Sequence, residues 1–288
     1  MNEVVTCSDL VHGWSFRPSE PTWKKRVRRA QTLLLRRRPR PATAVIKPVF
    51  PAQRWSVLFL FCPDDRLSSS QLFSLQRLRD TDVPLLVIAA TRAPRSMPEG
   101  VQDLADALIW KSLSGYDFSA YTIALEVLAV GSAGADVFVM NDSVFGPFHD
   151  VIAHAFSSPW EMAAWTACGK FENHVQSYAF AIKALDGSKL KQLRPVFFEH
   201  YALDDPLDVV LCQETRLARV AARAMSVGAM WAPRALDVDV TLTFPFELMR
   251  HSFPFLKKSL LGKYSRLQSR SDVLDWLSQH HHPAVEST

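Results

Sequence analysis

The sequence has few features of a secreted, membrane-spanning or zinc-binding protein. Its four cysteines lie far apart without C-x-x-C spacing, which argues against a disulfide framework or a zinc site. No apolar run approaches the roughly 18 residues needed to span a bilayer. The first residues lack the basic and apolar regions of a signal peptide. We therefore expect a reduced, cytosolic protein.

Basic residues are concentrated in one segment near the N-terminus. The formal net charge is +4, yet residues 24–40 contain nine Lys and Arg and no acid. The other 24 Lys and Arg are outnumbered by 29 Asp and Glu. Thr22 is a plausible N-cap, and Pro39 and Pro41 would end a helix. An apolar stripe at helical spacing is formed by Trp23, Val27, Ala30 and Leu34. Residues 22–40 are thus predicted to include a basic amphipathic helix.

Three partners are open for this helix. An anionic membrane surface is favoured, because a basic helix with an interfacial Trp suits it and each Lys or Arg contributes about 1 kcal/mol there. Nucleic acid is the rival partner, but the acidic remainder of the chain argues against it. The third possibility is a helix that packs on the rest of the protein with its charges in solvent.

The chain from about residue 54 alternates between strand and helix patterns. Buried strands are predicted at 57–62, 85–90, 107–110 and 136–140, with helices after Ser68–Ser70 and over 118–130. This alternation implies parallel pairing with right-handed crossovers, so we predict an α/β fold with a Rossmann-like parallel sheet. Beyond residue 150 the spacing predicts a mainly helical part, including Glu161–Ala184 and Val209–Met225. The His280–His282 run is interpreted as a frayed terminus.

This pattern suggests three regions. Residues 1–43 would be the basic N-terminal segment, 44–265 the α/β domain, and 266–288 a C-terminal helix and tail.

Polar residues follow the strand predicted at 136–140. Asn141, Asp142 and Ser143 would emerge at its carboxyl end, where ligands bind in open α/β sheets. A carboxylate there can hold a metal-diphosphate or a donor sugar, so Asp142 is the candidate ligand for Mg²⁺ or Mn²⁺. It offers one carboxylate where an Asp-x-Asp motif would offer two. The alternative is a polar turn that caps the strand.

A second candidate loop follows the strand predicted at 107–110. Gly115, Tyr116 and Asp117 lead into the next helix, whose free N–H groups could bind a diphosphate. Asp117 could instead simply cap that helix. Asp64 and Asp65, at the end of the first strand, would lie at the same nucleotide-facing edge.

Five motifs in order give a resemblance to a known family. They are Gly115–Phe118, Asn141–Ser143 with Gly146-Pro147, Trp165-Thr166, His174–Tyr178 and Phe253–Lys258. Over roughly residues 44–262 the series resembles the rhamnan synthesis F family of bacterial polysaccharide glycosyltransferases. The resemblance implies a glycosyltransferase type A fold, a nucleotide-sugar donor, often dTDP-rhamnose, and a growing polysaccharide acceptor. Leu113 and Ser119 stand where the family typically has Asn and Gly, and a Gly is missing after Trp165.

Inverting transfer from such a donor needs a base that deprotonates the acceptor hydroxyl. Asp142, Asp204 and Asp205 are the candidates, with Glu199 and His200 beside the latter two. His174 and Tyr178 would face together on a helix as an acceptor-site pair, unless His174 is a core histidine. The donor-binding set is predicted to include Asn141, Ser143 and Gln176.

The sequence therefore predicts a rhamnosyltransferase for O-antigen or capsule synthesis, peripheral on the inner face of the cell membrane. It would use a dTDP-rhamnose-like donor and a lipid-linked glycan acceptor, and no nucleic acid. The alternative is a degenerate transferase-like subunit that binds glycan or a partner without catalysis.

Overall fold

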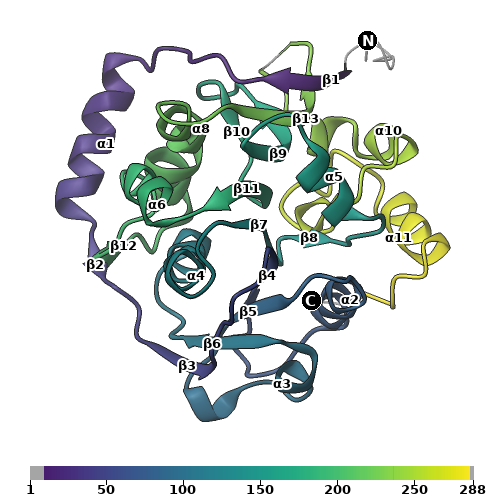
Figure 1. Ribbon diagram of the computed structural model, residues 1–288. Helices are drawn as coiled ribbons and strands as arrows, with labels where there is room; N and C mark the ends of the chain where they lie inside the picture. The colour runs from purple at the N-terminus through teal and green to yellow at the C-terminus, as the bar shows by residue number, and fades with distance from the viewer. Residues whose placement is uncertain (1–9, 236, 286–288) are drawn as a thin grey trace.

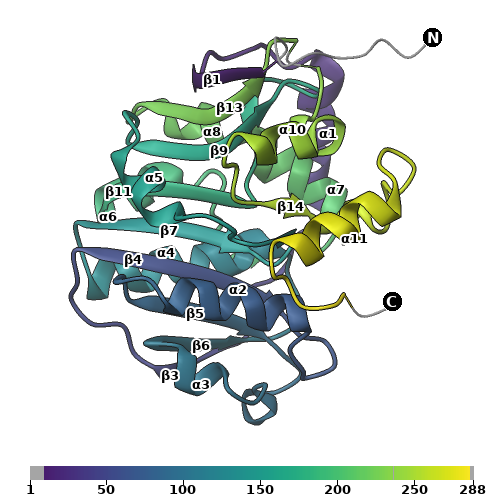
Figure 2. The same ribbon diagram turned by 90° about the vertical axis from the view of Figure 1, so that its right-hand side faces the viewer.

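A computed structural model describes residues 10–235 and 237–285, which form a central sheet with helices on both faces (Figure 1). The sheet has ten strands. They are β1 (Leu10–Ser15), β3 (Thr43–Lys47), β4 (Arg54–Phe61), β5 (Leu85–Ala90), β6 (Ala107–Lys111), β7 (Ala135–Asn141), β9 (Met162–Cys168), β10 (His174–Val175), β11 (Ala179–Leu185) and β13 (Val227–Pro233). Their order is β1-β13-β9-β11-β7-β4-β5-β6-β3, with β10 paired to β9 (Figure 2).

The middle of the sheet is parallel. Strands β7, β4, β5 and β6 pair in parallel, as do β13 and β9, whereas β11, β3 and β1 join antiparallel. All of β5 and β6 is buried, as expected for parallel strands covered on both faces. The predicted α/β fold with a Rossmann-like parallel sheet is confirmed.

Helices cover the two faces of the sheet (Figure 1). One face carries α4 (Asp117–Gly131), α6 (Gly187–Leu193) and α8 (Thr215–Ala221), and the other carries α2 (Ser69–Arg79) and α5 (Val151–Ser157). The predicted cap of α2 is present, because Ser68 and Gln71 form a capping box. Alternate residues of β4 enter different cores, Trp55 and Val57 on the α4 side and Leu58 on the other. Two short helices, η2 (Pro94–Ser96) and α3 (Val101–Leu104), precede β6.

The prediction of helix over Glu161–Ala184 was wrong, since this region contains β9, β10 and β11. Every residue of β9 is buried. A strand buried on both faces has no apolar-polar alternation, so its pattern does not differ from that of a buried helix. The second region, Val209–Met225, is helical as predicted. It spans the end of α7 (Pro206–Val209), the π-helical turn η3 (Val210–Glu214) and α8.

The mainly helical part begins further along the chain than predicted. It comprises α9 (Val240–Thr243), α10 (Pro245–Arg250), the short η4 (Lys258–Leu260) and α11 (Arg270–Gln279). The histidine run after α11 is not frayed, because His282 is buried with its ring 5.0 Å from that of Phe145, and His280 stacks on Trp276. The division into regions at residues 43 and 265 stays a prediction.

Two small ribbons complete the fold. β2 (Arg38–Pro39) pairs with β12 (Tyr201–Ala202), and β14 (Leu256–Lys257) pairs with β8 (Val144–Phe145). The helix α1 (Trp23–Leu35) ends before the two prolines and is shorter than the predicted basic segment. Within the described ranges, no helix has the length and apolar character that crossing a membrane requires.

Candidate active site

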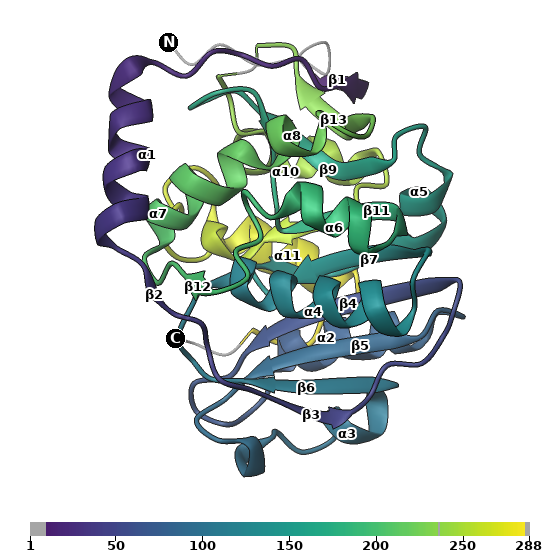
Figure 3. The same ribbon diagram turned by 60° about the vertical axis from the view of Figure 1, so that its left-hand side comes forward.

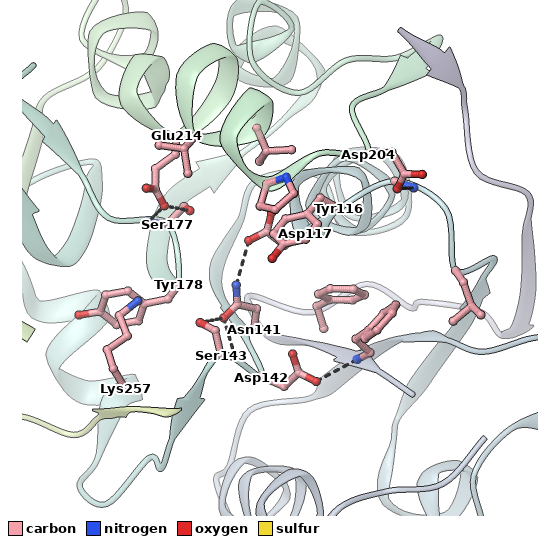
Figure 4. Close-up of a pocket in the computed structure, with 17 residues that line it drawn as sticks. Tyr116, Asp117, Asn141, Asp142, Ser143, Ser177, Tyr178, Asp204, Glu214 and Lys257 are labelled. Carbon is pink, nitrogen blue, oxygen red and sulfur yellow. Dashed lines mark hydrogen bonds between the residues drawn. The ribbon is translucent and has the colours of Figure 1, made fainter. Parts of the chain in front are cut away.

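A cavity of about 510 Å³ opens at the carboxyl edge of the parallel strands (Figure 4). Phe59 and Phe61 of β4 and Asn141 of β7 form part of its wall, and the loop after β6 forms another part. Its polar lining includes Tyr116, Asp117, Asn141, Asp142, Ser143, Ser177, Asp204, Glu214 and Lys257. The two loops that the sequence singled out, around residues 117 and 142, therefore meet in one cavity.

The loop before α4 is held by a buried lysine. Lys111, the last residue of β6, donates hydrogen bonds from Nζ to the carbonyls of Ser112, Ser114 and Gly115 at 2.7–3.1 Å. Gly115 has φ +72°, and a Cβ there would lie 2.7 Å from Ser119 Oγ and 2.8 Å from Pro41 Cγ. Glycine is thus required at this position both by conformation and by space.

Asp117 and Asn141 connect the two loops directly. Asn141 Nδ2 donates to Asp117 Oδ2 at 3.0 Å, and the Phe118 amide donates to Asp117 Oδ1 at 2.8 Å. Asn141 Oδ1 in turn accepts from the amide and the hydroxyl of Ser143, at 3.0 and 2.6 Å. The Asn141–Ser143 segment therefore does more than end a strand, because the side-chain amide of Asn141 orients the carboxylate of Asp117 in the neighbouring loop.

Glu214 lies beside Asp117 in the cavity. It is the last residue of the π-helical turn η3, an irregularity that is frequent at functional sites. Its Oε2 accepts hydrogen bonds from the Ser177 hydroxyl at 2.5 Å and from the Ser177 amide at 3.2 Å. These bonds fix the carboxylate at the cavity wall, as Figure 4 shows.

The pKa of Asp117 is raised to about 7. Burial is the largest cause, and the negative charge of Glu214 is the next, while the hydrogen bonds from Phe118 and Asn141 oppose them. A carboxyl group with a pKa near neutrality can both take up and release a proton under physiological conditions. That property is typical of a general acid or base.

Lys257 brings a positive charge to the same cavity. It lies on β14, and its Nζ is 3.9 Å from the centre of the Tyr178 ring. Burial lowers the pKa of Lys257 below the usual value, and the charges of Asp239, Glu214 and Asp117 oppose this shift. The β14–β8 ribbon places the ammonium group beside the loop of Asp142, opposite Glu214 (Figure 4).

Asp142 is fixed by one neighbour at the end of β4 and one on α2. Its Oδ2 accepts from the Phe61 amide at 2.9 Å and from Gln71 Nε2 at 2.6 Å. The hydrogen bonds therefore engage one carboxylate oxygen. Within the described part of the chain there is no group of three or more His, Cys, Asp or Glu side chains that could hold a metal ion. The donor set around Asp142 therefore does not fit an Mg²⁺ or Mn²⁺ ion held by protein ligands alone.

Other predicted site residues lie elsewhere. Neither Asp64 nor Asp65 lines the cavity. Asp64 forms an ion pair with Arg92 at 3.3 Å, and Asp65 accepts a hydrogen bond from the Arg92 backbone amide at 3.0 Å. Asp205 is the N-cap of α7 and accepts from the amides of Leu207 and Asp208. Asp204 does line the cavity, where it accepts from the Gly115 amide at 2.8 Å.

The predicted helical pairing of His174 with Tyr178 was wrong, because residues 174–175 form a strand. His174 is buried outside the cavity lining, and its Nδ1 lies 2.7 Å from the Glu172 carbonyl, which matches the alternative of a core histidine. Gln176 is also outside the lining. Its side chain contacts Thr166 and Asp239.

Sequence reasoning missed Glu214 and Lys257 as site residues. Lys257 lies within the Phe253–Lys258 motif, which could have marked it. Glu214 has no local signal, since it sits in an ordinary-looking helical segment and reaches Ser177 only in three dimensions.

The fold and the cavity define an α/β protein with an acidic and lysine-containing site at the ligand-binding edge of its sheet. The family model of rhamnan synthesis protein F matches residues 85–285, and the chain belongs to this family. Comparison with curated proteins gave no match.

Two solved structures are similar at a low level. One is 4-diphosphocytidyl-2C-methyl-D-erythritol synthase from Anaerococcus prevotii, with a TM-score of 0.40 and 9% identity over 70% of this chain and 96% of the other. The second is the inositol-1-phosphate CTP transferase from T. maritima, with a TM-score of 0.34 and 11% identity over 70% of this chain and 98% of that chain.

Proposed function

We propose that this protein transfers a deoxyhexose, with L-rhamnose the expected sugar, from a nucleotide-sugar donor to a growing cell-surface polysaccharide. Family membership supports a role in rhamnan synthesis. The observation that carries the proposal is the cavity that Asp117, Glu214 and Lys257 line together, where the charges of both carboxylates act on the ammonium group of Lys257. A carboxylate base and a cation are the two elements that inverting transfer from a dTDP-linked donor requires.

In this mechanism Lys257 lies beside the donor diphosphate. The bond between the anomeric carbon and the diphosphate oxygen breaks, and its electron pair leaves with dTDP. The ammonium group stabilises the charge that develops on the leaving oxygen, in a site partly screened from water. Asp142, held by Phe61 and Gln71, is the proposed contact for the donor sugar.

Asp117 is the proposed base. Its carboxylate takes the proton from the acceptor hydroxyl as the hydroxyl oxygen bonds to the anomeric carbon from the face opposite the diphosphate. A pKa of about 7 suits this role, because a base with that pKa is substantially ionised at neutral pH and still binds the proton. Burial and then the charge of Glu214 keep the pKa of Asp117 high, so Glu214 is a positioning residue. We therefore propose Asp117 as the base in place of Asp142, Asp204 and Asp205, the three candidates from the sequence.

The acceptor and its place in the cell are part of the proposal. We expect a lipid-linked O-antigen or capsule glycan, reached from the cytoplasmic side of the membrane with α1 toward the lipid. The use of Mg²⁺ or Mn²⁺ stays a prediction that the donor set of Asp142 does not favour.

The second candidate is a binding subunit without catalysis. It is favoured by Leu113, which lines the cavity at the position where the family typically carries Asn. Turnover separates the two, because a binding subunit would release no dTDP from the donor.

The test measures dTDP release from dTDP-β-L-rhamnose in the presence of polysaccharide acceptor. Asp117→Asn is expected to lower the rate at least a hundredfold, since general-base catalysis typically contributes about 10²–10⁴. Asp103→Asn, an exposed carboxylate on α3, is the matched control and should leave the rate unchanged. Wild-type protein without turnover, or an active Asp117→Asn variant, would contradict the proposal.

A further inference from the structure

The helix α1 is attached to the protein through its polar face. Arg29, only 8% exposed, forms an ion pair with Glu172 and donates to the Leu211 carbonyl and to Thr215 Oγ1, both at 2.8 Å. One turn further on, Thr32 is buried beside Asp208. Buried, charge-assisted bonds of this kind fix the orientation of a helix. Figure 3 shows α1 along the outside of α7 and α8.

The opposite face of α1 is apolar and faces solvent. Trp23 is 69% exposed and Leu34 75%, and Val27 and Ala30 between them are exposed as well. These four residues recur at three- and four-residue spacing and so form one continuous stripe. Apart from Leu33, which packs against the core, the usual arrangement is therefore inverted, with Arg29 and Thr32 against the protein and the apolar stripe outside. Scattered exposed apolar residues need no explanation, but a continuous stripe marks an interaction surface.

Cations flank this stripe. Lys24 and Arg28 are exposed one turn apart, and neither has an acidic partner among the residues that the structure describes. By contrast, Arg26 pairs with Glu20, and Arg36 pairs with Asp208. The unpaired cations make the outer face of α1 complementary to a negatively charged surface. Two copies of α1 packed face to face would bring like charges together, which disfavours a second copy as the occupant.

We propose that the outer face of α1, formed by Trp23, Val27, Ala30 and Leu34 with Lys24 and Arg28, docks on an anionic lipid bilayer. The helix, about 20 Å long, lies in the plane of the interface. Its apolar stripe enters the boundary between headgroups and acyl chains while the cations contact anionic headgroups. The Arg29 network holds the body of the protein at a fixed orientation to this surface.

Docking also brings the cavity close to the membrane. Leu35, the last residue of α1, lines a hollow with Arg36 and Arg38 just beyond it. Asp204 lines the same hollow and also the candidate active site. A lipid-linked acceptor would therefore arrive beside the cavity. This second part rests on the proposed function, whereas the docking surface itself does not.

The test is co-sedimentation of the full chain with vesicles of phosphatidylcholine alone or with about one-third phosphatidylglycerol. We expect binding to the anionic vesicles that weakens in high salt. The double variant Trp23→Ser/Leu34→Ser and the double variant Lys24→Glu/Arg28→Glu should each lower the partition constant at least tenfold. Val130→Ser/Leu267→Ser, two apolar residues 86% and 54% exposed elsewhere, is the matched control and should bind like the wild type.

Four results of the vesicle assay would overturn the proposal. They are wild-type protein that stays in the supernatant, a stripe variant that binds normally, equal binding to neutral vesicles, and a control variant that loses binding equally. A lipid-free dimer that disappears in the stripe variant would identify a second copy as the occupant and overturn the choice of lipid. None of these measurements uses the sugar donor, so a failed transferase assay and a failed docking assay are distinguishable.

Discussion

The coupling of Glu214 to Asp117 makes a specific prediction about pH dependence. Glu214→Gln keeps the shape of the side chain and a hydrogen-bond acceptor for Ser177, but removes the negative charge. In the wild type, burial and then the Glu214 charge raise the pKa of Asp117 to about 7. In the variant burial is the one printed cause that still raises this pKa, and the hydrogen bonds from Phe118 and Asn141 still lower it, so the pKa of Asp117 should fall. For like charges about 6–12 Å apart at an effective dielectric constant of about 20, the change is about one to two pKa units, or ~1.4–2.8 kcal/mol.

The assay is dTDP release as a function of pH. The ionised form of Asp117 is the base, so wild-type activity should rise with pH through about 7. In Glu214→Gln the rise should move to lower pH by the amount above. Asp103→Asn, the matched control, should keep the wild-type profile. An unchanged profile in Glu214→Gln, with activity retained, would refute the assignment of Asp117 as the titrating base.

Three further predictions concern charge and backbone. In Asp117→Asn we expect higher stability than the wild type at pH 8 by about 1–2 kcal/mol and little difference at pH 4, measured by urea unfolding. Because the pKa of Asp117 is raised, the folded protein binds the proton of this carboxyl group more tightly than the unfolded chain does. The stability that the protonated carboxyl group contributes is fully present below pH ~4 and is lost as the pH rises through about 7. Lys257→Met should lower kcat in dTDP release at least tenfold, because the positive charge beside the leaving group is lost. Recovery of kcat in Lys257→Arg would identify the role of Lys257 as electrostatic. A normal kcat in Lys257→Met would contradict that role. Gly115→Ala should lower the melting temperature, because φ at this position is +72° and the added Cβ would lie under 3 Å from Ser119 Oγ and Pro41 Cγ. An unchanged melting temperature would show that the loop can relax.

Much of the α/β core could be predicted because its signals are local. The strand at 85–90 was predicted with its observed bounds, and the helix after Ser68 has the serine cap that its sequence suggests. The region 161–184 was wrongly predicted to be helical, because β9 and most of β11 are buried strands whose apolar runs carry no period.

The candidate site was predictable to the extent that it follows strand ends. Asp117, Asn141 and Asp142 meet because parallel strands bring their carboxyl ends to one edge. Glu214 and Lys257 come from η3 and β14, which reach the cavity through long-range packing that no local pattern encodes. The same limit applies to α1, whose stripe was visible in the sequence, whereas the direction of that stripe depends on the partners of Arg29.

The most direct test of the central claim is calorimetric titration of dTDP-β-L-rhamnose into the wild type, Lys257→Met and Asp103→Asn. We predict one donor site per chain, binding weakened at least tenfold by Lys257→Met, and wild-type affinity in Asp103→Asn. A wild type that binds no donor, or a Lys257→Met variant that binds it with unchanged affinity, would contradict the assignment of the cavity as a nucleotide-sugar site.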